Sequence, residues 1–167
     1  VDTIYFGGGT PSFLGADALA TILTTIRRSF DVDPNAEITL EVNPESATQS
    51  LLSAAMDAGV NRISMGMQSC RDEELSLLGR LHSAKDALCA FEKIRKIGFQ
   101  NVSLDLMYAL PHQSLGDFSE SLSATLSMAP EHISFYCLTL SEGVPLYQKR
   151  ESLPSEETAR EMYLLAH

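Results

Sequence analysis

A glycine, a short turn and a β-rich run recur in this chain, and this recurrence limits the possible folds more than any other feature. Residues 59–65 read Gly-Val-Asn-Arg-Ile-Ser-Met, and residues 98–104 read Gly-Phe-Gln-Asn-Val-Ser-Leu. Residues 132–135, His-Ile-Ser-Phe, repeat the end of the pattern. Each unit places a strand directly after a helix and a turn, which is typical of a parallel α/β protein.

Five apolar, β-rich runs predict five strands, at residues 3–6, 38–42, 62–67, 102–108 and 132–138. Apolar side chains at helical spacing predict the helices between them, as in the stripe from Leu19 to Phe30. Five strands with four intervening helices fit either an open doubly wound sheet or part of a (β/α) barrel. A complete eight-stranded barrel takes about 250 residues, and this chain has 167. We therefore favour an α/β fold that is a partial (β/α) barrel of the TIM type, truncated at its first strand.

Glycine and serine residues mark the ends of the predicted helices. Gly59 and Gly98 follow the last turn of two helices, where glycine is favoured. Ser83, Ser114 and Ser155 each precede a helical segment with an acidic residue in its first turn, as helix N-caps do. No Pro/Gly/Ser-rich linker interrupts the chain, so we expect one domain. Because there is no initiator Met and the first strand begins at once, we expect residues 1–167 to be a fragment of a longer protein.

The charge balance excludes one class of partner. The net charge is −10, whereas a nucleic-acid surface needs clustered Lys and Arg to bind phosphates. No apolar stretch approaches the roughly 20 residues of a membrane span, and no signal peptide is visible. We expect no nucleic-acid partner and no membrane span.

The three cysteines do not form a recognisable metal or disulfide motif. Cys70, Cys89 and Cys137 are widely separated and odd in number. Their spacing is neither that of a disulfide framework nor that of a zinc or iron–sulfur site. We expect three buried thiols in a reducing compartment and no metal ligands in this chain.

Every predicted strand ends in hydrogen-bonding groups, and ligands of parallel α/β folds bind at the carboxyl ends of the strands. In chain order the groups are Gly7-Gly8-Gly9-Thr10, then Glu41 and Asn43, then Gly66, Gln68 and Ser69, then Asp105 and Tyr108, and finally Tyr136 and Thr139. Glu41 and Asp105 lie within otherwise apolar strands, where a buried carboxylate needs a partner. That partner is either a ligand or a salt bridge inside the barrel.

Three consecutive glycines are more than a turn requires, because each loses more backbone freedom on folding than any other residue. Their spacing fits neither the dinucleotide-binding Gly-x-Gly-x-x-Gly pattern nor a P-loop. We therefore predict a flat backbone surface against which a polar group of a ligand lies.

These strand ends, in this order, resemble the radical S-adenosylmethionine (SAM) family. The resemblance covers essentially the whole chain and rests on five ordered stretches: Tyr-Phe-Gly-Gly-Gly-Thr-Pro-Ser, Glu-Val-Asn-Pro-Glu, Asn-Arg-Ile-Ser-Met-Gly-Met-Gln-Ser, Leu-Gly-Arg-Leu-His-Ser and Ser-Leu-Asp-Leu-Met-Tyr-Ala-Leu-Pro-His-Gln-Ser. The branch they resemble contains oxygen-independent coproporphyrinogen III oxidase and its relative, the haem chaperone HemW. Residues 79–83, Gly-Arg-Leu-His-Ser, look more like the chaperone, so we favour the chaperone branch.

The resemblance implies a seat for the methionine and ribose parts of SAM. Gly8, Gly9 and Thr10 match the glycine-rich motif whose backbone receives the amino and carboxylate groups of the methionine part. Glu41 matches the carboxylate that holds the ribose hydroxyls, a suitable role for a group that only accepts hydrogen bonds.

Four further residues are implied as cofactor contacts. Gln68, Arg80 and Asp105 match positions that contact the nucleotide or the methionine part, some of them in a second bound SAM molecule. Thr139 falls where the last strand would close over the ligand.

The resemblance also implies a four-iron four-sulfur cluster on a Cys-x-x-x-Cys-x-x-Cys loop. No such spacing occurs here, so we expect the loop upstream of Val1 and the cluster ligands outside this chain. This chain alone should then be catalytically inert, and no catalytic residue is assigned. A haem-associated His-Asn-x-x-Tyr element would lie beyond His167, and we interpret the four histidines present as ordinary side chains rather than haem ligands.

Three functions fit these observations. The first is a radical SAM core of a haem chaperone that binds the cluster, SAM and haem and delivers haem to an acceptor protein. The second is an oxidase that oxidatively decarboxylates two propionates of coproporphyrinogen III. The third is a cofactor-free α/β binding domain. The expected compartment is the cytoplasm, with the mitochondrial matrix as the alternative for a eukaryotic source.

Overall fold

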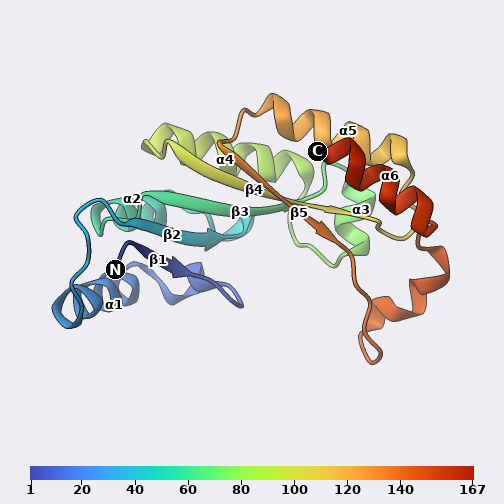
Figure 1. Cartoon of the computed structure of the whole chain (residues 1–167). Helices are drawn as coiled ribbons and strands as arrows, with labels where there is room; N and C mark the ends of the chain where they lie inside the picture. Colours follow the sequence, from blue (N-terminus) through green and yellow to red (C-terminus); the bar gives the residue numbers. More distant parts are fainter.

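The computed structural model describes residues 1–167, the whole chain. It contains one sheet of five parallel strands whose order in space follows their order in the chain (Figure 1). The strands are β1 (Thr3–Phe6), β2 (Glu37–Val42), β3 (Arg62–Gln68), β4 (Asn101–Tyr108) and β5 (His132–Cys137). All five predicted strands are confirmed, with only small shifts at their ends.

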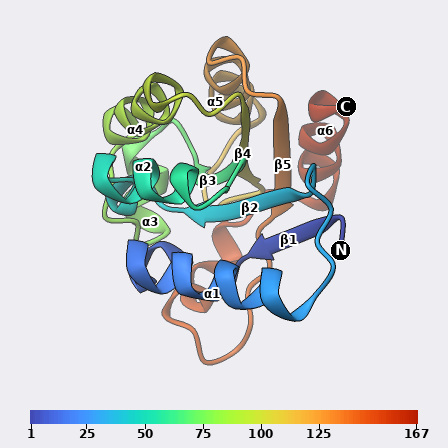
Figure 2. The same cartoon turned by 90° about the vertical axis from the view of Figure 1, so that its left-hand side faces the viewer.

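The strand order decides between the two predicted architectures. A doubly wound sheet reverses its strand order at a switch point, and no reversal occurs here. The strands instead curl into an arc, and the helices that follow β1 to β4 lie outside it (Figure 2). The chain therefore forms a half-barrel, which confirms the prediction of a partial TIM-type barrel.

Six α-helices and three 3-10 helices accompany the strands, of which η3 and α6 follow the last strand and the others lie between strands. The α-helices are α1 (Ala16–Ser29), α2 (Gln49–Asp57), α3 (Asp72–Leu77), α4 (Ala84–Ile97), α5 (Leu115–Ser127) and α6 (Glu156–Ala166). The 3-10 helices are η1 (Pro11–Leu14), η2 (Pro44–Ser46) and η3 (Pro145–Ser152). Helix α3 was not predicted, because its 6 residues are too few to show a helical period. None of the helices has both the length and the apolar composition needed to cross a membrane.

The predicted helix starts are confirmed by their hydrogen bonds. The side chains of Ser83 and Ser114 each accept a bond from the backbone N–H of the aspartate three residues later. That aspartate accepts a bond from the serine N–H in return, so each helix begins with a capping box. Ser155 caps α6 in the same way with its hydroxyl alone.

The two faces of the curled sheet differ in polarity, because successive side chains of a strand point to opposite faces. The outer face packs on the helices and carries the main apolar core, in which Ile63, Met65 and Leu104 are fully buried. On the inner, concave face Ser64 of β3 lies opposite Ser103 of β4. The concave face therefore suits a polar ligand.

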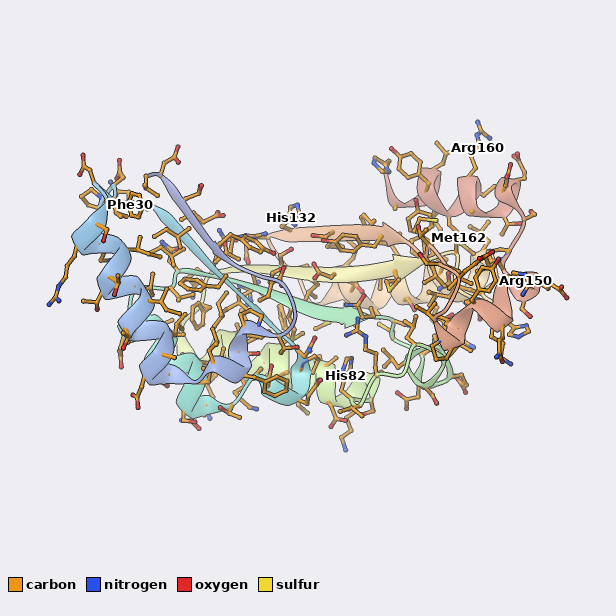
Figure 3. The ribbon with its side chains drawn as sticks, turned by 90° about the horizontal axis from the view of Figure 1, so that it is seen from below. Phe30, His82, His132, Arg150, Arg160 and Met162 are labelled. Carbon is orange, nitrogen blue, oxygen red and sulfur yellow. The ribbon has the colours of Figure 1, made fainter.

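A second, smaller core fixes α6 to the sheet. Met162 of α6 (labelled in Figure 3) packs with Leu106 of β4 and with Phe118 and Leu122 of α5. Tyr108 joins this cluster, its ring centroid 5.9 Å from that of Phe118. Tyr108 thus lies on the helix side of the sheet, which corrects its predicted place among the ligand-facing strand ends.

The cysteines also depart from the prediction. Cys70 is partly buried, but Cys89 on α4 and Cys137 at the end of β5 are exposed. The expectation of three buried thiols is therefore wrong for two of them, because both lie on faces of their elements that no neighbour covers.

Replacing Leu104 by alanine tests the main core. Leu104→Ala should lower the free energy of unfolding by about 2–5 kcal/mol, because truncating a fully buried leucine leaves a cavity between sheet and helices. Urea unfolding followed by circular dichroism measures the change. Leu81 is 87% exposed, so the control Leu81→Ser should change it by less than about 0.5 kcal/mol. Equal effects of the two substitutions would contradict this assignment of the core.

Candidate functional site

A polar cavity of about 230 Å³ opens at the carboxyl ends of β1 to β4. The strand ends and the loop between α3 and α4 supply its lining. Six predicted cofactor-binding residues line it: Gly9, Thr10, Glu41, Gln68, Arg80 and Asp105. The fold therefore brings together, in one cavity, residues that are far apart in the sequence.

The three consecutive glycines are needed for two different reasons: lack of space at Gly7, and the backbone conformation at Gly8 and Gly9. A Cβ added to Gly7 would lie 2.6 Å from the Tyr5 ring and 3.0 Å from Glu41 Oε1, so only glycine fits there. Gly8 and Gly9 have φ angles of 83° and 59°, a left-handed conformation that other residues rarely adopt. No atom lies within 4 Å of a Cβ added at either position. Here the loop presents bare backbone to open space.

The Glu41 carboxylate joins β2 to the glycine-rich loop. Its Oε1 accepts a hydrogen bond from the Tyr5 hydroxyl at 2.8 Å, and its Oε2 accepts one from the Gly8 N–H at 3.0 Å. Burial, and then the Glu41 carboxylate, raise the pKa of Tyr5 to about 12, so the phenol keeps its proton and donates. Glu41 takes part in none of the ion pairs of the chain.

Two further contacts fix the glycine-rich loop to the turn after β2. The Asn43 side-chain amide donates to the Thr10 hydroxyl at 3.4 Å. The Ser12 hydroxyl donates to the buried Ser46 hydroxyl at 2.7 Å, and Ser46 accepts the backbone N–H of Asn43 at 3.0 Å. The loop and η2 are therefore positioned together.

Strand β3 ends in an irregularity that turns Gln68 into the cavity. The pairing with β4 shifts register between Gly66 and Gln68, and such a bulge re-aims a side chain. Gln68 has a φ of 68°, a conformation that costs a non-glycine residue roughly 1–3 kcal/mol and often marks a functional site. A Cβ on Gly66 would lie 2.9 Å from Gln68 Nε2 and 3.2 Å from Asn43 Oδ1. Gly66 therefore leaves room for both amides.

Asp105 projects from β4 into the same cavity. Its Oδ1 accepts a hydrogen bond from the Ser64 hydroxyl at 3.3 Å. Burial raises the pKa of Asp105 above its ordinary value of 3.8, the hydroxyls of Ser134 and Ser64 partly lower it, and Glu41 raises it further. Asp105 forms no ion pair either. The alternative of a salt bridge inside the barrel is therefore not realised for either carboxylate.

Arg80 supplies the only cationic side chain of the lining. It lies on the loop between α3 and α4 rather than on a strand, and it forms no ion pair. The cavity thus contains one guanidinium and two carboxylates, none of which has an ionic partner within the chain.

Some strand-end groups lie elsewhere. Thr139 is exposed after β5 and does not line the cavity, and Tyr136 of β5 is 51% exposed outside it. Ser69 is buried, with its hydroxyl bonded to the Glu74 carboxylate and close to the Ser121 hydroxyl. The first four strands therefore form the site, and the fifth contributes no lining residue.

One polar side chain of the lining, Ser64, was not predicted from the sequence; the other unpredicted lining residues are Pro11 and Val42. Ser64 alternates with the buried Ile63 and Met65 along β3, so the period-two pattern placed it on the concave face. Ser64 lies four residues before the end of β3, so it does not belong to the polar groups that mark the strand end.

No group of three or more His, Cys, Asp or Glu side chains in the chain could hold a metal ion. Cys70 follows β3, Cys89 lies on α4 and Cys137 ends β5. The residues present therefore do not fit an iron–sulfur cluster.

Replacing Asp105 by asparagine should raise the free energy of unfolding at pH 7, since the folded protein then no longer holds a partly buried negative charge. Because its pKa is raised on folding, Asp105 binds its proton more tightly in the folded state. In the wild-type protein, the contribution of Asp105 to the free energy of unfolding therefore becomes more favourable as the pH falls through the raised pKa toward 3.8. The advantage of Asp105→Asn should shrink over the same range, measured by urea unfolding at several pH values.

The control Asp117→Asn should have the opposite effect and lower the free energy of unfolding at pH 7. The hydroxyl and backbone N–H of Ser114 hold the pKa of Asp117 below its ordinary value. Its carboxylate therefore stabilises the fold above that value, and the stabilisation is lost as the pH falls. If Asp105→Asn also lowered stability at pH 7, the Asp105 carboxylate would be a structural partner and our interpretation would be wrong.

Curated relatives match nearly the whole chain. It is 40% identical over 167 residues to "Radical S-adenosyl methionine domain-containing protein 1, mitochondrial" of Bos taurus, covering 98% of this chain and 38% of that protein. It is 39% identical over 166 residues to "Heme chaperone HemW" of Bacillus subtilis, covering 96% of this chain and 44% of that protein. The chain thus spans about two fifths of the length of these relatives.

The solved structures that match have the same fold. Coproporphyrinogen III oxidase (HemN) from Escherichia coli, described as a radical SAM enzyme, superposes with a TM-score of 0.88 at 27% identity, over 98% of this chain and 38% of that one. The Elp3 protein of Methanocaldococcus infernus superposes with a TM-score of 0.82 at 21% identity, over 99% of this chain and 45% of that one, which shows the fold alone. Residues 1–124 match the radical SAM superfamily. By this match and by its curated relatives, the chain belongs to the radical SAM superfamily, in the branch of HemW and radical SAM domain-containing protein 1.

Proposed function

We propose that the cavity at the ends of β1 to β4 binds S-adenosylmethionine. The observation that carries the proposal is the convergence of Glu41, Asp105 and Arg80, without ionic partners, in a cavity that Gly9 also lines, with the bare backbone of Gly8 directly before it in the chain. At neutral pH SAM bears an ammonium, a sulfonium and a carboxylate. Two carboxylates and one guanidinium are the complement of that charge pattern.

The roles of individual residues follow from their chemistry. Gly8 and Gly9 let the methionine part of SAM approach the backbone, with Thr10 beside it. Glu41 keeps lone pairs for the ribose hydroxyls, since two carboxylate oxygens offer about four acceptor sites and the chain uses two of them. Gln68 and Asp105 supply further polar contacts, and Arg80 suits a carboxylate. Thr139 could contact the ligand only if the segment after β5 moved toward the cavity.

The family implies a four-iron four-sulfur cluster, and the residues of this chain do not fit one. We propose that its ligands lie outside this chain and that this chain alone is inert in redox chemistry. When bound, the cluster supplies the electron that radical SAM chemistry requires. The contribution of this chain is to bind and orient SAM.

For the whole protein we propose a haem chaperone that binds haem and delivers it to an acceptor protein. The support is the 39% identity to a relative named heme chaperone HemW and the Gly-Arg-Leu-His-Ser stretch at residues 79–83. We place the protein in the cytoplasm, or in the mitochondrial matrix if its source is eukaryotic, since one relative is named mitochondrial.

Oxidation of coproporphyrinogen III is the second candidate, favoured by the TM-score of 0.88 to the HemN structure. An anaerobic assay of the reconstituted full-length protein with coproporphyrinogen III separates the two functions. Formation of protoporphyrinogen would establish the oxidase, and its absence would exclude it. A cofactor-free binding domain would fit only if neither SAM nor haem bound.

Haem titration of the full-length protein tests the chaperone. We expect tight binding with a shifted Soret absorption band and saturation at a fixed ratio of haem to protein. A titration without spectral change would contradict the proposal. Competition with an excess of apomyoglobin then shows whether the bound haem can be transferred.

The substitution Gly8→Val tests the SAM seat in the full-length, cluster-reconstituted protein. A β-branched side chain is strained at a φ of 83°, and it would occupy the open space above the loop. We expect the Kd for SAM to rise by more than about tenfold, or about 1.4 kcal/mol, measured by equilibrium dialysis.

The chain offers a matched control for this experiment. Gly143 also has a positive φ, of 92°, with no atom within 4 Å of an added Cβ, but it follows β5, whereas Gly8 lies in the loop after β1 and contacts Glu41 of the cavity. Gly143→Val should therefore leave SAM binding unchanged. Equal Kd values for the two variants would contradict the assignment of the glycine-rich loop to SAM binding.

A further inference from the structure

Both ends of the short loop that carries Arg80 are fixed by helix ends. At the end of α3, Gly79 has a φ of 70° and donates its N–H to Ser76 O, and Arg80 donates its N–H to Leu75 O. These two bonds form the Schellman pattern of a helix end. At the other end, Ser83 begins α4 with its capping box. The helix ends therefore fix the backbone on both sides of Arg80, Leu81 and His82.

Within the loop, successive side chains point in different directions. Arg80 lines the cavity, Leu81 is 87% exposed, and His82 is only 5% exposed. Arg80 has no ion pair or side-chain hydrogen bond to hold its guanidinium, and a free arginine side chain has many rotamers. The direction of Arg80 therefore depends on how its neighbours anchor the backbone.

His82 anchors this loop to two parts of the cavity wall. Its Nδ1 lies 3.2 Å from Glu45 Oε2, and its Nε2 lies 3.4 Å from Met67 O. Glu45 belongs to η2, which also holds the glycine-rich loop, and Met67 directly precedes Gln68. The His82 ring therefore lies against η2 and the end of β3 (Figure 3), with its side chain 1% exposed.

We propose that His82 is a positioning residue that fixes Arg80 toward the cavity, so that the guanidinium meets the carboxylate of the bound amino-acid moiety. The proposal rests on the proposed binding of SAM. A binding group must be held within about 0.5 Å by the contacts behind it. The His82 ring meets that requirement, since it fixes the Arg80 loop at two points, to Glu45 of η2 and to Met67 of β3.

A double-mutant cycle in the full-length, cluster-reconstituted protein tests this role, with the Kd for SAM measured by equilibrium dialysis. Arg80→Ala and His82→Ala should each raise the Kd by about tenfold. If His82 acts through Arg80, the double variant should bind SAM no more weakly than Arg80→Ala alone. A histidine with a purely structural role would instead add its effect to that of Arg80→Ala.

Two further variants keep the test decisive if His82→Ala unfolds. Glu45→Gln removes the charge that faces His82 from a side chain that is 30% exposed, so the fold should tolerate it. It should weaken SAM binding about threefold and have no effect in the Arg80→Ala background. Leu81→Ser is the matched control, because it changes the same loop at its exposed residue and should leave the Kd unchanged.

The outcomes separate this inference from the proposed function. If the wild-type protein does not bind SAM, the proposed function fails and the role of His82 fails with it. If it binds SAM, but Glu45→Gln and His82→Ala bind normally or add to Arg80→Ala, only the role of His82 is overturned.

Discussion

The two hydrogen bonds of the Glu41 carboxylate determine much of the geometry of the site. One reaches the Tyr5 hydroxyl and the other the Gly8 N–H, so a single side chain of β2 fixes both the end of β1 and the loop that follows it. Gly7 leaves room for this arrangement, since an added Cβ would lie 2.6 Å from the Tyr5 ring and 3.0 Å from Glu41 Oε1. The first glycine of the run is therefore required by the packing of Tyr5 and Glu41, independently of the ligand that we propose.

A polar concave face is costly for the fold, and the cost is visible at two residues. Burial raises the pKa of Asp105, so the ionised carboxylate is held where the fold disfavours charge. Gln68 has a left-handed backbone at the bulge of β3. Neither feature stabilises the sheet, whereas Leu104 and its neighbours on the outer face do. This division between a stabilising outer face and a strained inner edge is typical of a binding site.

The fold and most of the site could be predicted because strands and glycines carry local signals. The five strands and the capping boxes of Ser83 and Ser114 follow from patterns a few residues long. Exposure of Cys89 and burial of His82 depend instead on which distant elements cover them, and a single sequence does not specify this. The φ angle of Gln68 was equally hidden, because glutamine gives no sign of a left-handed backbone.

The charged groups of the cavity lie on elements of different rigidity, and this difference has a consequence for binding. Glu41 and Asp105 belong to paired strands, so the sheet itself fixes their backbone. Arg80 lies on a loop without strand pairing, and its guanidinium has no partner in the chain. Ordering an arginine costs side-chain entropy, and a fixed backbone leaves fewer rotamers to be ordered when the ligand binds. The buried His82 ring, in contact with both η2 and β3, is the element that can supply this pre-organisation.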